Sequence, residues 1–157
     1  MRVAQEEVER WRGAGVSRRA RGVLDTGIIA ALSLFDPAEL PIESAITAIT
    51  LGELSRGPYA TDDPIKRARR IAVLQHAEAT FGEALPYDSE AARVFGLICA
   101  SVYAIGRQPR QRTADLMIAA TATRNGLPLY TTNPKDFAGL DAQVTIIPVT
   151  RPEEATG

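Results

Sequence analysis

Apolar residues along the chain follow two patterns: short continuous runs, and longer stretches in which they recur at the spacing of an α-helix. The short runs predict strands at residues 22–24, 44–46, 127–131 and 144–149. The helical spacing predicts helices at residues 28–34, 48–56, 64–81, about 89–105 and 113–125. Because strands alternate with helices, the pattern predicts an α/β fold with a mostly parallel central sheet covered by helices on both faces.

Turn and capping residues set the expected limits of these helices. Residues suited to the N-cap position precede three of them, namely Thr47, Asp88 or Ser89, and Thr113. Pro64 suits the first turn of the long helix at 64–81. Gly126 is placed to end the helix at 113–125, because glycine accepts the left-handed backbone that often follows a helix.

The chain divides into one domain with a short segment at each end. Residues 22–150 carry the regular alternation, and residues 151–157 are expected to form a C-terminal tail. Residues 1–21 stand apart as an N-terminal extension, in which apolar residues from Val3 to Trp11 would share one side of a short helix. That extension is interpreted as a tail in preference to a partner-binding arm.

Four acidic residues are expected to meet at one edge of the sheet. Asp25 follows the first strand, and Asp136 follows the strand at 127–131. Glu53 lies in the second turn of the helix that leaves the second strand, and Asp115 lies in the first turn of the helix at 113–125. Because ligands bind outside the carboxyl ends of parallel strands, all four side chains are predicted to face one binding site.

Each acid taken alone has an ordinary structural explanation. Asp25 could cap a helix, Asp115 could complement a helix dipole, Asp136 could belong to a turn and Glu53 could be a solvated helix residue. Their expected convergence favours function, because carboxylates gathered in one cleft repel one another and would take up protons without a cation. Mg²⁺ or Mn²⁺ suits oxygen ligands, and a metal held by carboxylates favours phosphodiester hydrolysis.

Composition and charge narrow the class of protein further. The 157 residues are 45% hydrophobic, and no apolar run approaches the ~20 residues of a membrane span, so no membrane association is expected. The single cysteine rules out an internal disulfide and suits the reducing cytoplasm. The net charge is −1, so contact with nucleic acid has to be local. Basic residues do cluster, at Arg18, Arg19 and Arg21, at Lys66, Arg67, Arg69 and Arg70, and at Arg107, Arg110 and Arg112.

The acidic positions and their surroundings resemble those of PIN-domain nucleases, and within them the VapC-like toxins of bacterial toxin–antitoxin modules. The resemblance extends over about residues 22–149 and is carried by the stretches Val-Leu-Asp-Thr at 23–26, Ile-Thr-Ala-Ile-Thr-Leu-Gly-Glu-Leu at 46–54, Arg-Thr-Ala-Asp-Leu-Met-Ile-Ala-Ala-Thr-Ala at 112–122 and Thr-Thr-Asn-Pro-Lys-Asp-Phe at 131–137. It implies an α/β/α sandwich that cuts RNA with Mg²⁺ or Mn²⁺. The positions that match the family's acids are Asp25, Glu53, Asp115 and Asp136.

The resemblance also implies partners and supporting residues. Toxins of this group form homodimers and are held inactive by a cognate antitoxin, which often inserts a basic side chain into the acidic site. Thr26 and Asn133 are candidates to orient a metal-bound water, although Asn133 could equally stabilise its own turn. Arg112 is a candidate to clamp a phosphate, or to pair with Asp115 or Glu53 in the absence of substrate.

Three departures from the family pattern stand out: Gly27 where Ser or Asn is frequent, Thr132 where Arg is frequent, and the additional residues 1–21. Because Thr132 supplies no cation, a phosphate contact has to come from elsewhere, such as Arg112 or the loop at 106–112.

Three other interpretations remain. The triplet Asp25-Thr26-Gly27 also matches the aspartic-protease signature, but those enzymes are all-β and need a second such segment. A PIN fold can serve as a non-catalytic RNA-binding module when its acids are lost, and this chain keeps all four. A nuclease directed at DNA would use the same metal chemistry, and nothing in the residues distinguishes the two sugars.

Overall fold

Four parallel strands form the centre of the computed structural model, which describes residues 18–153. The strands are β1 (Arg21–Leu24), β2 (Glu43–Ala45), β3 (Leu129–Thr131) and β4 (Ile146–Pro148), in the order β2-β1-β3-β4. Every pairing is parallel, as the alternation of strands and helices predicts. The third and fourth strands are shorter than predicted. The helix expected near Val3–Trp11 lies outside the described residues.

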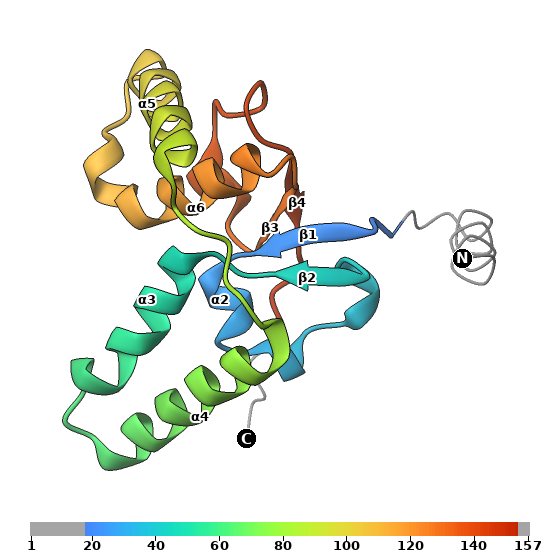
Figure 1. The fold of residues 1–157 in the computed structure, drawn as a ribbon, viewed down its shortest axis with the longest axis vertical. Helices are drawn as coiled ribbons and strands as arrows, with labels where there is room; N and C mark the ends of the chain where they lie inside the picture. The colour runs from blue at the N-terminus through green and yellow to red at the C-terminus, as the bar shows by residue number, and fades with distance from the viewer. Residues whose placement is uncertain (1–17, 154–157) are drawn as a thin grey trace.

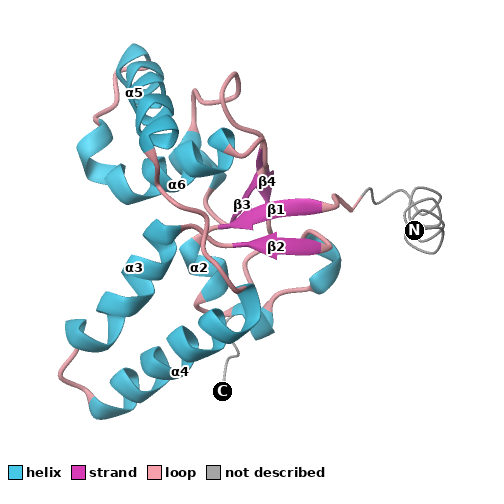
Figure 2. Cartoon of the chain, in the orientation of Figure 1, coloured by secondary structure: helices cyan, strands magenta, loops and turns pink. Residues whose placement is uncertain are grey.

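Helices cover both faces of this sheet, which confirms the predicted three layers (Figures 1 and 2). One layer holds α5 and α6, and the other holds α2, α3 and α4. Their bounds are α2 (Thr26–Ile29), α3 (Ala48–Arg56), α4 (Pro64–Phe81), α5 (Ser89–Ala104) and α6 (Thr113–Arg124). Short 3₁₀ turns join them, at η1 (Leu32–Leu34), η2 (Pro37–Glu39), η3 (Gly57–Ala60), η4 (Pro109–Arg112) and η5 (Pro134–Phe137).

No single helix within residues 18–153 has the length and apolar character needed to cross a membrane. Among the described residues, one strongly bent pair of helices, Ser89–Ala104 and Pro109–Arg124, reaches that length and composition when its two members are taken together.

Several predicted helix limits are confirmed. Thr47 caps α3 by accepting a hydrogen bond from the Thr50 amide at 3.2 Å, and Asp88 caps α5 by accepting from the Ala91 amide at 2.9 Å. Pro64 opens α4, and Gly126 follows α6 with a φ of 64°.

Two limits were predicted wrongly. Thr113 does not cap α6: it is the first helical residue, and its hydroxyl donates to the Arg110 carbonyl at 3.3 Å. The reason is that η4 runs directly into α6, so the chain is already coiled before Thr113. The helix predicted at 28–34 starts earlier, because α2 begins at Thr26 with Asp25 as its N-cap, and it is split before η1, because Ala31 leaves helical geometry. The chain then turns so that Phe35 packs into the core.

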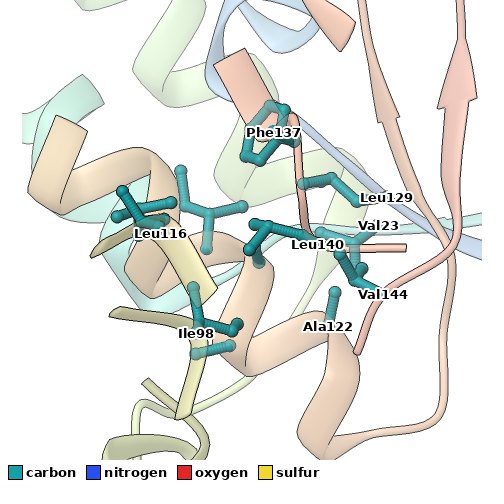
Figure 3. Close-up of a cluster of buried hydrophobic side chains, with 12 residues drawn as sticks. Val23, Ile98, Leu116, Ala122, Leu129, Phe137, Leu140 and Val144 are labelled. Atoms are coloured by element: carbon teal, nitrogen blue, oxygen red, sulfur yellow. The ribbon is translucent and has the colours of Figure 1, made fainter. Parts of the chain in front are cut away.

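Alternation along the two central strands builds a core on each face of the sheet. Val23 of β1 and Leu129 of β3 are paired in register and face α5 and α6, as the close-up of that core shows (Figure 3). Leu24 and Tyr130, the next pair in register, belong to the core on the α2–α4 face. All four side chains are buried. Packing on both faces therefore fixes the register of β1 against β3.

This register determines where a binding crevice can form. β1 and β3 are neighbours at the centre of the sheet. The connection from β1 runs to β2 at one edge of the sheet, and the connection from β3 runs to β4 at the opposite edge. Between two parallel strands whose connections diverge in this way, the carboxyl edge is left open. The residues that immediately follow β1 and β3 are Asp25 and Thr132, so the first predicted acid lies at that opening.

Gly22 of β1 approaches the core on the α2–α4 face so closely that a side chain there would have no room. The effect of replacing a glycine by alanine on stability should therefore depend strongly on its position. A Cβ at Gly22 would press into the ring of buried Tyr130, at 2.8 Å from Cδ2, and against Pro41 at 3.3 Å. We expect Gly22→Ala to lower the free energy of unfolding by about 1–3 kcal/mol through overpacking. Gly52→Ala serves as the control, because Gly52 is an exposed residue of α3 and a Cβ there would have nothing within 4 Å. It should raise stability by about 0.5–1 kcal/mol. Urea unfolding of both variants checks this, and equal stability of the two would contradict it.

Candidate functional site at the carboxyl edge of the sheet

Asp25 is held rigidly at the end of β1. Its backbone amide donates to the Tyr130 carbonyl of β3 at 2.9 Å. One carboxylate oxygen accepts from the Thr26 amide at 2.9 Å, and the other accepts from the Thr131 hydroxyl at 2.8 Å. Asp25 is only 9% exposed and Thr131 is fully buried. The carboxylate therefore has both oxygens oriented by the two central strands.

Glu53 reaches the same place through a chain of hydroxyl groups. The Thr26 hydroxyl donates to the Glu53 carboxylate at 2.8 Å and lies 2.9 Å from the Thr50 hydroxyl. Because a hydroxyl carries one proton, Thr50 is the donor in the second contact. Thr50 lies one turn before Glu53 on the same face of α3. Thr26 thus connects the residue after β1 with the acid on α3.

Asp115 and Asp136 approach from the α6 side of the crevice. Asp115 lies in the first turn of α6, where the helix dipole favours a negative charge. Asp136 lies in η5, which follows β3. Arg112, at the end of η4, forms an ion pair with Asp136 at 2.7 Å. The sequence-based alternative that paired Arg112 with Asp115 or Glu53 was wrong, because Arg112 pairs with Asp136 of η5, to which the Arg107–Lys135 hydrogen bond also joins the basic loop.

The pKa values show that the four acids act on one another. Burial, followed by the charges of Asp25, Glu53 and Asp136, raises the pKa of Asp115 from 3.8 to about 6, against a smaller opposing effect of Arg112. Burial also raises the pKa of Asp25, and its hydrogen bonds from Thr131 and Thr26 oppose that rise. The structure therefore brings the four predicted acids to one rim, where their negative charge is only partly compensated.

This donor set fits a hard divalent cation by chemistry and by charge. Carboxylate oxygens are the ligands that Mg²⁺ and Mn²⁺ prefer, and a cation would relieve the repulsion that raises the pKa of Asp115. The side chains do not form a closed cage as they stand: within residues 18–153, no three Asp, Glu, His or Cys side chains lie close enough to hold an ion. The fit therefore rests on the donors and their charge.

The side chain of Asn133 forms hydrogen bonds with residues other than the four acids. Its side-chain oxygen accepts from Arg151 at 2.8 Å, and its nitrogen donates to the Thr132 hydroxyl at 3.3 Å. The Asn133 side chain does not cap η5, and its shorter contact, with Arg151, joins this turn to the C-terminal segment. Both predicted roles of Asn133 stay predictions. Arg151 lies in the segment predicted as a C-terminal tail, and residues 154–157 of that segment are outside the described part.

Sequence reasoning missed Thr131 and Thr50, the two hydroxyl residues that support Asp25 and Glu53. A signal for each was present in the sequence. Thr131 ends the strand predicted at 127–131, and Thr50 stands three residues before Glu53 at helical spacing. Small polar residues at a strand end or on a helix face are common, so neither position was distinctive without the fold.

The chain has a parallel sheet between two helical layers with carboxylates at its carboxyl edge, an architecture that PIN-like α/β/α proteins share. A scan of the chain against models of protein families finds no match. Ribonuclease VapC5 of Mycobacterium tuberculosis (strain ATCC 25618 / H37Rv) is 39% identical to it over 130 residues, which cover 81% of this chain and 93% of the relative. The chain therefore belongs to the VapC ribonuclease family.

Solved structures agree with this assignment. VapBC-5 from Mycobacterium tuberculosis, described as a member of the VapBC family of toxin–antitoxin systems, superposes with a TM-score of 0.71 at 36% identity, covering 84% of this chain and 99% of that chain. FitAcB from Neisseria gonorrhoeae has a TM-score of 0.61 at 24% identity, covering 83% and 96%, and supports the fold alone.

The repulsion at the rim predicts that Asp115→Asn stabilises the protein in metal-free buffer. At pH 7.5 the folded wild type carries an ionised Asp115 that its surroundings disfavour. We expect the amide to raise the free energy of unfolding by roughly 1–2 kcal/mol, since solvent screens part of the repulsion. A raised carboxyl pKa lowers stability as the pH rises from 3.8 to about 6, so the gain should disappear near pH 3.8.

Urea unfolding with EDTA at both pH values measures this difference. Asp62→Asn is the control, because Asp62 is an exposed acid beyond α3. A destabilised Asp115→Asn at pH 7.5, or a gain that persists at the lower pH, would contradict the electrostatic explanation.

Proposed function

We propose that this protein is the ribonuclease toxin of a toxin–antitoxin pair, and that it hydrolyses RNA phosphodiester bonds with Mg²⁺ or Mn²⁺ held by Asp25, Glu53, Asp115 and Asp136. The observation that carries the proposal is the gathering of four carboxylates at the carboxyl edge of the sheet, where burial and the neighbouring charges raise the pKa of Asp115. Such a site in a chain of the VapC ribonuclease family favours metal-assisted hydrolysis over structural use of the acids.

The chain's own residues would hold and orient the reacting groups. Thr131 and the Thr26 amide fix both oxygens of Asp25. The Thr26 hydroxyl fixes one oxygen of Glu53. A divalent cation bound by these carboxylates supplies charge neutralisation at the phosphate and lowers the pKa of a bound water. The two threonines orient oxygens of Asp25 and Glu53 before substrate arrives. The four carboxylates would still have to approach one another to hold a cation.

A cognate antitoxin is the expected protein partner. The solved relatives include VapBC-5, described as a toxin–antitoxin system. Beside Glu53 the surface has a mainly apolar depression of about 270 Å³, lined by Ala30, by Gly57 and by α3 and α4 residues that include Leu54, Val73, Arg69 and Arg70. We propose that an apolar segment of the antitoxin docks there, which would place one of its basic side chains beside Glu53. The homodimer implied by the family stays a prediction.

The nuclease is tested with purified, antitoxin-free protein and structured RNA at neutral pH. We expect cleavage with Mg²⁺ or Mn²⁺ and none with EDTA, because the carboxylates need a cation to act. Asp25→Asn and Asp115→Asn should each lower the cleavage rate by about 100-fold or more, the usual scale for loss of a charged group at a reacting centre.

Asp62→Asn provides the matched control and should cut at the wild-type rate. Cleavage that survives EDTA, or an Asp115→Asn variant that retains near-wild-type activity, would overturn the metal-site assignment. Cutting of single-stranded DNA but not RNA would replace the proposed substrate with DNA.

A further inference from the structure

A second concavity lies directly beside the acidic rim. It encloses about 420 Å³, within the usual range for small-ligand sites, between the loop that follows α5 and the turn η5. We call it the basic pocket, because its lining includes the cations Arg107, Arg112 and Lys135 and one acid, Asp136. Two of these residues, Arg112 and Asp136, also belong to the rim.

The three cations are differently engaged. Arg107 donates from Nη1 to the Lys135 carbonyl at 2.9 Å, which uses one of its five N–H donors and joins the loop to η5. Arg112 pairs with Asp136. Lys135 is exposed, and its ammonium forms no ion pair with any residue in the described range 18–153. The pocket therefore presents more positive charge than its single carboxylate can balance.

We propose that the basic pocket binds a phosphodiester group of the RNA strand adjacent to the one that is cleaved. This inference rests on the proposed nuclease function. A strand whose scissile phosphate lies at the four carboxylates must continue past them, and the pocket is contiguous with the rim through Asp136 and Arg112. Arginine and lysine are the side chains that bind phosphate oxygens, arginine through its planar fork and lysine as a point charge.

The acidic rim and the basic pocket act on phosphate in opposite ways. The rim repels phosphate until a cation is bound, because its acids are only partly compensated. The pocket attracts phosphate without any added ion. Arg112 stands at the boundary between the two and can bind either the Asp136 carboxylate or a phosphate oxygen. Arg107 and Lys135 hold the flanking strand in this arrangement, and they lower the KM for RNA without touching the reacting atoms.

Fluorescence anisotropy with a 5′-labelled single-stranded RNA oligonucleotide tests the pocket. All variants are made in the Asp115→Asn chain, so that the probe stays intact. We expect Arg107→Gln and Lys135→Gln each to raise the Kd roughly three- to tenfold and to reduce the slope of log K against log salt by about 0.7, the value for one phosphate contact on a single strand.

Arg93→Gln is the charge-matched control. Arg93 is an exposed arginine paired with Glu90 near the start of α5, about nine residues, or roughly 14 Å along the helix, from the pocket residue Val102. Arg107→Gln also removes the hydrogen bond to the Lys135 carbonyl, so a loss of affinity in that variant could come from a local structural change. Lys135→Gln keeps this hydrogen bond and therefore tests the charge alone. A DNA oligonucleotide of the same sequence forms the second arm, and an equal loss of affinity there also supports a phosphate contact.

The two proposals can fail separately. If wild-type protein cuts RNA while Arg107→Gln and Lys135→Gln, made in the Asp115→Asn chain, match Arg93→Gln in Kd and salt slope, the pocket proposal is overturned and the nuclease stands. If wild-type protein cuts no RNA but these two variants alone lose affinity for the oligonucleotide, the pocket proposal is supported as a nucleic-acid site and the nuclease is not.

Discussion

The hydrogen bond from the buried Thr131 hydroxyl to the Asp25 carboxylate joins the ends of β1 and β3, and the arrangement of the rim depends on it. It exists because Val23 and Leu24 are packed in register against Leu129 and Tyr130, with one pair in each core. A slip of one residue between these strands would reverse which side chains face each layer. Packing in the two cores therefore sets the geometry of Asp25 at the rim.

The spacing of apolar residues predicted most of the strands and helices. The shared location of the four acids was predicted from the rule that parallel strands present their carboxyl ends at one edge of the sheet. That rule placed Asp25 and Asp136 after β1 and β3 without any knowledge of their contacts. It could not show that Thr131 binds Asp25, because that contact depends on the register of β1 against β3. Nor could it choose the partner of Arg112, because that depends on how the turns η4 and η5 approach each other. The split helix after Asp25 was missed for a similar reason, since packing of Phe35 outweighs local helix propensity.

The near-neutral net charge of the chain conceals a strong local separation of charge. Four acids converge on the rim, and three cations line the neighbouring basic pocket. The single ion pair between Arg112 and Asp136 crosses the boundary between these two regions. This separation suits the proposed RNA strand, with one phosphate at a metal on the acidic rim and the adjacent phosphate at the cations of the basic pocket. A uniformly basic surface would bind nucleic acid without positioning it for hydrolysis.

The most direct measurement is a Mn²⁺ titration of the full chain at pH 7.5, followed by the electron paramagnetic resonance signal of free Mn²⁺. If the four carboxylates form the metal site, wild-type protein will remove that signal, and Asp25→Asn and Asp115→Asn will weaken binding by roughly tenfold or more while Asp62→Asn will not. A wild-type protein that leaves the signal unchanged at millimolar Mn²⁺, or Asp→Asn variants at the rim that bind as well as wild type, would contradict it.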